Sequence, residues 1–392
     1  MSEAHTLADA DWPRREDLGA LVAALGASNL RWVGGAVRDT LLGLPVKDID
    51  AATPLHPQEV IAALKAAGIR SVPTGIDHGT ITALLAGGPV EITTLRHDVS
   101  TDGRRATVAF ATDWSEDAAR RDFTINALYA DPLSLQISDY FGGLDDLAAR
   151  RVRFIGDARE RIREDHLRIL RYYRFQARFG SVLDPEGEEA CAELAPMLKG
   201  LSRERVAMEL LSLFGLPDPG ETVNRMAANG VLAIVLPEAD PTPLPALIAV
   251  EQAQNAAPDA LRRLAALLPP DPKLADNVAA RLRLSTAQRK RLALMARRDA
   301  ASEPQVLAYR EGVDVARDLL LLAGRSTGAL DGWSPPTFPL KGGTIVARGV
   351  AAGPDVARIL KAVEARWIAE GFPSAERIAV MLTEELPPKP NQ

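Results

Sequence analysis

Cysteine is nearly absent from this sequence, with Cys191 the only one among 392 residues. A single thiol cannot form an internal disulfide and excludes a cysteine-rich zinc site, which fits a reducing cytoplasm. The N-terminal residues show neither a basic n-region nor an apolar h-region, and no stretch approaches the roughly 18 apolar residues of a membrane span. We therefore expect a cytoplasmic protein without a membrane partner.

Net positive charge is absent as well, because 46 Lys and Arg are outnumbered by 52 Asp and Glu. A uniformly basic nucleic-acid coat is thereby excluded, so any contact with RNA must come from local patches. Two arginine-rich stretches, residues 150–178 and 281–298, are candidates. A solvated helix face is the more common meaning of such a charge run.

The hydrophobic pattern changes near residue 155. Before it, short β-rich runs alternate with helical patterns such as residues 57–67. After it, apolar residues recur at spacings of three and four, as from Ile162 to Ala177, so the remainder should be nearly all helix. Proline-containing breaks divide the helical part at residues 216–220, 237–245, 269–272 and 335–339. A chain of this length should contain more than one domain.

Two glycines, Gly34 and Gly35, follow a short strand pattern and precede a helical pattern. Glycine lets backbone N–H groups approach a phosphate without a Cβ in the way. Arg38 would then supply charge-assisted hydrogen bonds to a triphosphate. Alone, a glycine pair after a strand is more often a plain turn.

The segment Asp48-Ile49-Asp50 favours a phosphate-binding turn over a plain turn at the two glycines. Residues i and i+2 of a strand point to the same face, so the two carboxylates project side by side while Ile49 packs into the core. Adjacent carboxylates repel unless something positive lies between them. Mg²⁺ binds few carboxylates plus phosphate oxygens, and two such ions activate an attacking hydroxyl and stabilise leaving pyrophosphate. A solvated acidic turn is the alternative.

Arginines and acidic residues also combine in two later segments. In the first, Arg121 would brace phosphates or ribose and Asp122 would orient it, although an arginine pair before a strand is most often surface. In the second, residues 164–174, a spacing of three predicts one polar helical ridge. That ridge consists of Asp165, Arg168, Arg171 and Arg174.

Asp165 and Arg168 have the chemistry to read a nucleobase. Cytosine N4 and adenine N6 are amino donors beside a ring-nitrogen acceptor, so an Asp acceptor next to an Arg donor pairs with either base. Uracil and guanine present a carbonyl where the Asp needs a donor, and a buried polar site rejects that mismatch strongly. The alternative is an exposed helix stitched by weak ion pairs.

Together and in this order, the segments resemble the class II CCA-adding enzyme and poly(A) polymerase family of the polymerase-beta-like nucleotidyltransferases. The matches cover most of residues 31–210 and a C-terminal stretch: VGGAVRDTLLGLPVKDID, EITTLRHDVSTDGRRATVAF, DAARRDFTINALYA, DYFGGLDDL, RIREDHLRILRYYRF, LSRERVAMEL and LKGGTIVARGVAAGPDVARIL. The resemblance implies an α+β fold whose palm-like head (residues 1–155) has a mixed sheet with helices. A helical neck with the base-reading helix (156–215) and a helical body and tail that bind tRNA (216–392) would follow.

The resemblance also implies residue roles. Asp48 and Asp50 would bind the catalytic Mg²⁺ ions, Asp165 and Arg168 would form the base-reading pair, and residues 96–113 correspond to the family's flexible loop. The nucleotide-binding residues would be Gly34, Gly35, Arg38, Arg121, Asp122, Asp165, Arg168, Arg171 and Arg174.

The implied reaction is template-independent addition of CCA to the 3′ end of tRNA. The RNA 3′-hydroxyl would attack the α-phosphate of CTP or ATP in line, with two metal ions assisting and pyrophosphate leaving. Positioning and electrostatics would supply most of the catalysis. The tRNA would be held by its acceptor arm and 3′ end, on a monomer or a homodimer.

Several alternatives remain open. A poly(A) polymerase would share the carboxylates, but residues 74–80 lack the basic, aromatic stretch typical of the bacterial enzymes. A CC-only or A-only tRNA nucleotidyltransferase fits the same motifs, and a non-catalytic RNA-binding protein is the alternative from another class. A fused His-Asp phosphohydrolase domain is not expected, because all five histidines precede residue 170.

Overall fold

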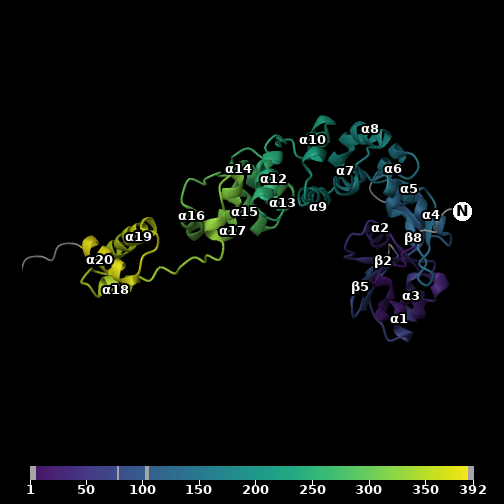
Figure 1. Cartoon of the computed structure of the whole chain (residues 1–392), viewed down its shortest axis with the longest axis horizontal. Coiled ribbons are helices and arrows are strands. Elements are labelled where there is room, and N and C mark those ends of the chain that lie inside the picture. Colours follow the sequence, from purple (N-terminus) through teal and green to yellow (C-terminus); the bar gives the residue numbers. More distant parts are fainter. Residues whose placement is uncertain (1–5, 77–78, 102–105, 387–392) are drawn as a thin grey trace, which may run out of the picture. The chain divides into compact units, whose positions relative to one another are not determined.

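The computed structural model describes residues 6–76, 79–101 and 106–386. The chain divides into two compact units, Met1–Pro241 and Thr242–Gln392, shown in Figure 1. The division falls inside the proline-containing break predicted at residues 237–245. The three-part division at residues 155/156 and 215/216 stays a prediction.

A mixed seven-stranded sheet forms the centre of the first unit, in the order β3-β4-β5-β2-β1-β8-β9. Only the neighbours β2 and β5 run parallel, and the other neighbouring pairs are antiparallel. A separate two-stranded sheet pairs β6 with β7. The strands are β1 (Arg31–Val33), β2 (Ile49–Thr53), β3 (Arg70–Gly75), β4 (Thr80–Leu85), β5 (Gly88–Thr94), β6 (Arg96–Thr101), β7 (Ala106–Phe110), β8 (Leu128–Ala130) and β9 (Ile137–Asp139). The mixed sheet with helices confirms the predicted α+β class.

The helices of the head begin where the sequence supplies caps or glycine. They are α1 (Glu16–Leu25), α2 (Gly35–Leu41), α3 (Pro57–Ala66), α4 (Trp114–Ala119) and α5 (Gly143–Ala148). In α3, the Glu59 side chain accepts a hydrogen bond from the His56 N–H (2.7 Å), and Pro57 occupies the first turn. Helices α1 and α3 pack together, and α3 also packs on β3 and β4 (Figure 1). The central strands are therefore positioned by a buried core, with Trp32 fully buried.

The rest of the first unit is helical. Its helices are α6 (Ala158–Glu164), α7 (Arg168–Phe179), α8 (Pro185–Leu194), α9 (Arg203–Phe214), α10 (Gly220–Ala228) and α11 (Val231–Val235). An aromatic cluster joins α7 to the head: Phe123 contacts Phe154 and Phe175 (ring centroids 5.0 and 5.1 Å apart), and Phe154 stacks on Tyr172 (5.6 Å). Large buried rings of this kind hold α7 firmly against residues 123–154.

The helix predicted through residues 162–177 is broken at Asp165. Helix α6 ends at Glu164, Asp165 is extended (φ −147°, ψ 106°), and α7 begins at Arg168. The Asp165 carboxylate accepts a hydrogen bond from the Leu167 N–H (3.1 Å), a local turn that competes with helix. The prediction that Asp165 shares one helical ridge with the three arginines was therefore wrong, whereas the arginines do share α7.

The second unit is entirely helical in the part that the structure describes. Its helices are α12 (Leu244–Ala253), α13 (Ala260–Leu267), α14 (Pro272–Arg281), α15 (Thr286–Met295), α16 (Pro304–Glu311), α17 (Val313–Leu322), α18 (Gly342–Val346), α19 (Pro354–Ala369) and α20 (Ala375–Glu385). A separate apolar cluster around Trp367 packs α18, α19 and α20 together. Among the described residues, no helix combines the length and apolar character that crossing a membrane requires.

Buried charge holds the α12–α17 part of this unit. Glu251 of α12 accepts hydrogen bonds from Arg262 (2.7 Å) and Arg263 (2.9 Å) of α13, and Arg262 also donates to Asp318 of α17 (3.1 Å). All four side chains are buried. Each charge there depends on its partners, since an unpaired buried charge is strongly unfavourable.

We expect Glu251→Gln to lower the free energy of unfolding by about 3 to 5 kcal/mol, because it removes the buried negative charge that Arg263 contacts and one of the two that Arg262 contacts. Denaturant unfolding, together with hydrogen exchange of the α12 and α13 amides, measures the loss. The control is Asp355→Asn, which breaks the Asp355–Arg358 pair whose side chains are 73% and 61% exposed and should change stability by less than about 1 kcal/mol. Equal losses in both variants would contradict this account.

Candidate functional site

The turn between β1 and α2 requires glycine. Gly34 has φ +70° and ψ −122°, a backbone conformation that favours glycine. A Cβ on Gly34 would also stand 3.6 Å from Arg121 Nη1. The turn thus leaves the backbone open beside Arg121, and Gly35 begins α2.

Arg38 of α2 is buried in a fixed position. Its Nη1 donates to Asn126 Oδ1 (2.5 Å), its Nε donates to Asp39 (2.8 Å), and its guanidinium lies 4.2 Å from the centroid of the Phe179 ring. Arg178 of α7 also donates to Asp39 (3.1 Å). The guanidinium is therefore oriented by both the head and α7.

Two carboxylates lie on neighbouring strands β2 and β5, and a third lies just before β2. Ile49 is buried and β2 begins there, so exposed Asp48 precedes the strand and partly buried Asp50 lies within it. Asp50 pairs in register with Glu91 of the parallel strand β5. Neither Asp48, Asp50 nor Glu91 forms an ion pair among the residues that the structure describes. Burial, with the charges of Glu91 and Asp48, raises the pKa of Asp50 to about 6, although Arg121 and Arg38 oppose the rise.

Arg121 is oriented by residues that sequence reasoning did not single out. Its guanidinium donates to Tyr129 Oη (2.9 Å) and to Asp117 (3.1 Å), and Tyr129 also donates to Asp117 (2.6 Å). Burial would raise the pKa of Asp117, but Arg121 and Arg120 lower it to about 2. The expectation that Asp122 orients Arg121 was wrong, because Asp117 of α4 does so.

Asp122 instead connects the head to α7. Its carboxylate accepts hydrogen bonds from Asn126 Nδ2 (2.9 Å) and from Arg171 Nε (2.7 Å). Burial would raise the pKa of Asp122, but the Arg171 charge and these hydrogen bonds outweigh it and lower the pKa to about 2. Glu209 of α9 in turn accepts from Arg174 Nε (2.5 Å) and lies 3.7 Å from Arg171. Asp122, Arg171 and Arg174 therefore belong to one network.

The predicted base-reading pair is held by separate partners. The Asp165 carboxylate accepts from Arg205 Nη2 of α9 (2.7 Å). Arg168 donates to Glu164 (2.6 Å) and, through Nη2, to the Arg120 carbonyl (3.0 Å). Arg168 Nη1 also donates to the Arg161 carbonyl (2.9 Å). The two residues meet through the backbone, where the Arg168 N–H donates to the Asp165 carbonyl (3.0 Å).

These contacts leave binding capacity on both side chains. A guanidinium has five N–H donors, and the three hydrogen bonds of Arg168 use two donors of Nη1 and one of Nη2. Each Asp165 oxygen accepts one hydrogen bond and has a second lone pair. Unused acceptor capacity therefore remains on Asp165 in the turn before α7, and unused donors remain on Arg168 at the start of α7.

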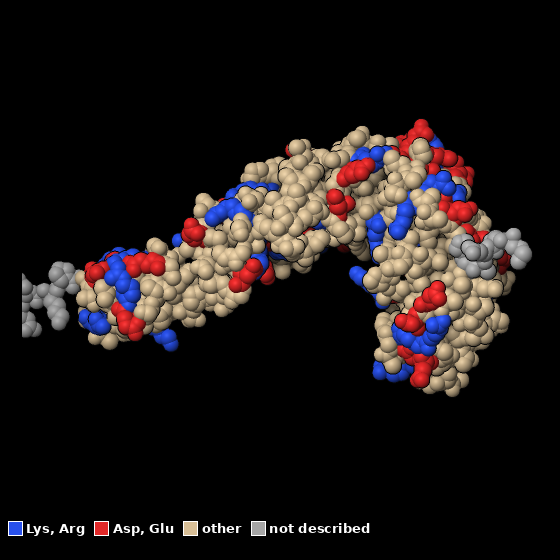
Figure 2. Space-filling view, in the orientation of Figure 1, with Lys and Arg blue, Asp and Glu red and all other residues tan. Residues whose placement is uncertain are grey.

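Most arginines in residues 150–178 are paired with acidic residues. Examples are Arg153 with Asp146 (2.8 Å) and Arg159 with Glu193 (2.7 Å). Figure 2 shows blue and red side chains intermixed over the helical part of the first unit. Many of these arginines therefore form ion pairs within the chain, so their number alone does not indicate a surface for RNA.

The predicted flexible loop at residues 96–113 contains a hairpin. Strands β6 and β7 pair from Arg96↔Phe110 to Thr101↔Ala106. Residues 102–105 lie outside the described residues, and the predicted flexibility stays a prediction.

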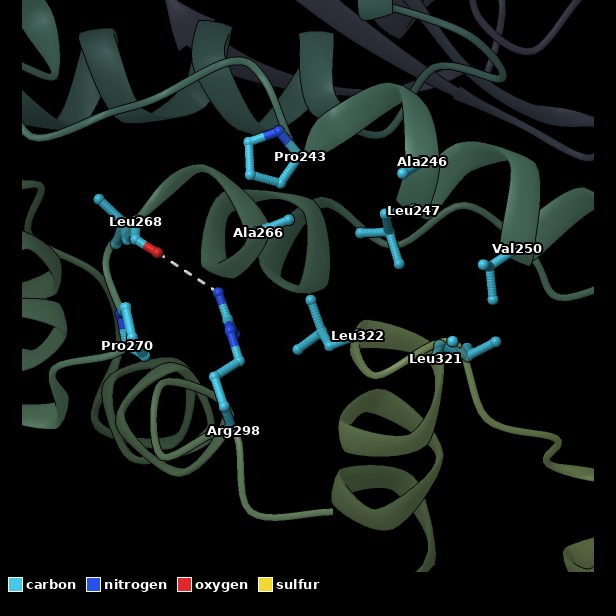
Figure 3. Close-up of a pocket in the computed structure, with 11 residues that line it drawn as sticks. Pro243, Ala246, Leu247, Val250, Ala266, Leu268, Pro270, Arg298, Leu321 and Leu322 are labelled. Carbon is cyan, nitrogen blue, oxygen red and sulfur yellow. Dashed lines mark hydrogen bonds between the residues drawn. The ribbon is translucent and has the colours of Figure 1, made fainter. Parts of the chain in front are cut away.

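A pocket of about 330 Å³ lies within the second unit. Figure 3 shows Leu247, Leu321 and Leu322 around it, with the Arg298 guanidinium at one side. Arg298 Nη2 donates to the Leu268 carbonyl (3.3 Å), so this cation is engaged with the backbone. None of the predicted site residues lines this pocket.

Functional residues that the sequence did not reveal are those whose partners are distant in the chain. Glu91 faces Asp50 only through the parallel register of β2 and β5, and Asp117 begins the same segment as Arg121 but carries no motif of its own. Arg205 and Glu209 lie in LSRERVAMEL, a stretch that matches the family but has no chemical pattern by itself.

The chain is similar to known proteins in both sequence and fold. Residues 30–153 match the family model described as "Poly A polymerase head domain", and residues 182–242 match "Probable RNA and SrmB- binding site of polymerase A". The chain is 36% identical over 394 residues to the mouse (Mus musculus) "CCA tRNA nucleotidyltransferase 1, mitochondrial", covering 91% of this chain and 87% of the relative. It is 44% identical over 185 residues to the "CCA-adding enzyme" of Oceanobacillus iheyensis, covering 47% of this chain and 45% of the relative.

A solved structure shares the fold along nearly the whole chain. The crystal structure of the Bacillus stearothermophilus CCA-adding enzyme in complex with CTP superposes with a TM-score of 0.76 and 26% sequence identity. The match covers 96% of this chain and 98% of that chain.

The raised pKa of Asp50 predicts a stability that depends on pH. Between the unfolded pKa of 3.8 and the folded pKa of about 6, the folded state binds more protons than the unfolded state, so stability falls as pH rises through this window. We expect Asp50→Asn to remove that fall and, without divalent metal, to raise the free energy of unfolding by about 1 to 3 kcal/mol near pH 8.

Thermal unfolding between about pH 4.5 and pH 8 in a chelator tests this prediction. The control is Asp145→Asn, which changes an exposed carboxylate of α5. Wild-type and Asp50→Asn curves that run parallel over the whole range would refute the assignment.

Proposed function

Because this chain belongs to the family of CCA-adding tRNA nucleotidyltransferases, we propose that it adds CCA to the 3′ end of tRNA from CTP and ATP. The observation that carries the proposal is the placement of Asp50, with Asp48 and Glu91, beside the charges of Arg38 and Arg121. Such an arrangement suits a triphosphate with a bound metal ion. The carboxylates would bind the metal ion, and the arginines would donate hydrogen bonds to the phosphate oxygens.

The chemistry of Asp48 and Asp50 fits a divalent metal ion. Both are hard oxygen donors, and a cation bound by them would offset the burial and the like charges that raise the pKa of Asp50. Among the described residues, no group of three or more His, Cys, Asp or Glu side chains could hold a metal ion, so the other ligands would come from the nucleotide phosphates and water. Nucleotidyl transfer in this family uses divalent metal, and Mg²⁺ is the ion that we propose. When bound, it supplies activation of the RNA 3′-hydroxyl and neutralisation of charge on the leaving pyrophosphate.

The surrounding residues orient the nucleotide. Gly34 and Gly35 leave space for the phosphates beside the backbone, and Arg38 and Arg121 are held in place by Asn126, Asp117 and Tyr129. Arginines fixed before the substrate arrives stabilise developing negative charge without reorganisation.

We assign the selection of the base to Asp165 and Arg168. The Asp165 carboxylate would accept a hydrogen bond from the amino group of cytosine or adenine, and Arg168 would donate one to the ring nitrogen beside it. Arg171 and Arg174 support this turn through Asp122 and Glu209, which joins base reading to the phosphate site.

The proposed partners are tRNA, bound through its acceptor arm and 3′ end, and the two nucleotides. Solved structures with the same fold include a CCA-adding enzyme of Thermotoga maritima in complex with tRNA. Others are CCA-adding enzymes in complex with CTP and with ATP. The chain acts as a monomer or a homodimer. A cytoplasmic location is proposed from its single cysteine, although the mouse relative is named mitochondrial.

The deciding experiment incubates the protein and Mg²⁺ with tRNA lacking CCA and with each nucleoside triphosphate, singly and mixed, and then sequences the RNA 3′ ends. We expect products that end in CCA and stop there, and we expect Asp48→Ala to abolish addition of every nucleotide while tRNA binding persists. Turnover at the wild-type rate in Asp48→Ala would refute the metal site. A long adenosine tail would identify a poly(A) polymerase, and CC or A alone a partial enzyme.

We expect Asp165→Ala to lower the preference for CTP and ATP over UTP and GTP by about tenfold or more, because removing one hydrogen-bonding partner of a base costs roughly 1 to 3 kcal/mol. Ratios of kcat/KM for the four nucleotides measure the preference. Asp145→Ala, a change at an exposed carboxylate of α5, serves as control. Unchanged selectivity in Asp165→Ala would count against its role as base reader.

A further inference from the structure

Helix α9 contacts the base-reading region through two side chains of opposite charge. Arg205 and Glu209 lie four residues apart and therefore on one face of the helix. Arg205 Nη2 donates to Asp165 Oδ2 (2.7 Å), whereas Glu209 accepts from Arg174 (2.5 Å). Each α9 residue thus holds a residue of opposite charge that belongs to the proposed nucleotide site.

We propose that Arg205 is a specificity-determining positioning residue that holds the Asp165 carboxylate as a hydrogen-bond acceptor in one fixed orientation. The inference rests on the proposed function of Asp165 as base reader and adds what makes that reading selective. Arg205 acts through Asp165 and needs no contact of its own with the nucleotide.

Fixation is needed because Asp165 lies outside a helix. The residue stands in the extended turn between α6 and α7, where neighbouring helical turns do not restrict its side chain. The Leu167 N–H binds Oδ1 (3.1 Å) and Arg205 binds Oδ2 (2.7 Å), so both oxygens are tethered from different elements. The remaining lone pairs then point in one set of directions, as selection by hydrogen-bond geometry requires.

The two α9 contacts differ in how much the fold depends on them. The Arg205 and Asp165 side chains are 38% and 30% exposed, so losing this pair should change stability little. The Glu209 side chain is only 3% exposed and serves Arg171 as well as Arg174, so its loss would strand buried charge. Arg205 is therefore the residue whose role can be separated from folding.

The test compares Arg205→Ala, Arg205→Gln and Arg205→Lys with the wild type on tRNA lacking CCA, measuring kcat and KM for CTP, ATP, UTP and GTP. The control is Arg15→Ala, which breaks the partly exposed Arg15–Asp17 pair at the start of α1, outside the proposed RNA-binding region. We expect Arg205→Ala and Arg205→Gln to lose about tenfold in preference for CTP over UTP, equivalent to roughly 1.4 kcal/mol. Arg205→Lys should recover part of it, and Arg15→Ala should match the wild type.

A double variant, Asp165→Ala with Arg205→Ala, gives the decisive comparison. If Arg205 acts through Asp165, the second substitution adds no further loss of selectivity to the first. Additive losses, selectivity preserved in Arg205→Ala and Arg205→Gln, or tighter CTP binding with unchanged selectivity would each overturn the proposal. Failure of the wild type to extend tRNA would instead refute the proposed function, and the two failures are thereby distinguished.

Discussion

The buried carboxylate of Asp122 holds the nucleotide-binding head and helix α7 in one arrangement. Through Asn126 it reaches Arg38, and through Arg171 it reaches the network of Glu209 and Arg174. Burial would raise its pKa, but Arg171 and Asn126 lower the pKa to about 2. Removal of this carboxylate would leave several buried polar groups unsatisfied at once, so the residues proposed to bind phosphate and those proposed to read the base depend on the same interaction.

Asp50 of β2 shows the opposite electrostatics. Burial and two neighbouring carboxylates raise its pKa to about 6, because no side chain among the described residues pairs with it. A site of this kind is less stable empty than an apolar one would be, which is a common consequence of preparing a site for a charged ligand. The paired networks around Asp117 and Asp122 keep this unstable arrangement in place.

Local patterns were enough to predict the α+β class, the change to helices near residue 155, and the proximity of Asp48 and Asp50. Each of those features depends on neighbouring residues, on strand alternation or on helical spacing. The partners of the charged residues were not predictable in the same way, because Asp122 pairs with Arg171 49 residues away and Asp50 meets Glu91 only through the register of two parallel strands. The break at Asp165 was missed because an apolar period of three and four continues across a turn that its own side chain stabilises.

The distribution of partners explains why composition is a poor guide to the RNA contacts. Most arginines of residues 150–178 bind acidic residues of this chain, so their number measures internal structure more than a surface for phosphates. Informative charges are instead those with unused capacity: the carboxylates of Asp48, Asp50 and Glu91, the remaining donors of Arg168, and the second lone pairs of Asp165. The proposed site therefore combines residues that are fully engaged in internal pairs, such as Asp117 and Asp122, with a few groups whose hydrogen-bonding capacity is unused. A binding site is precise when its binding groups are held by such a supporting frame.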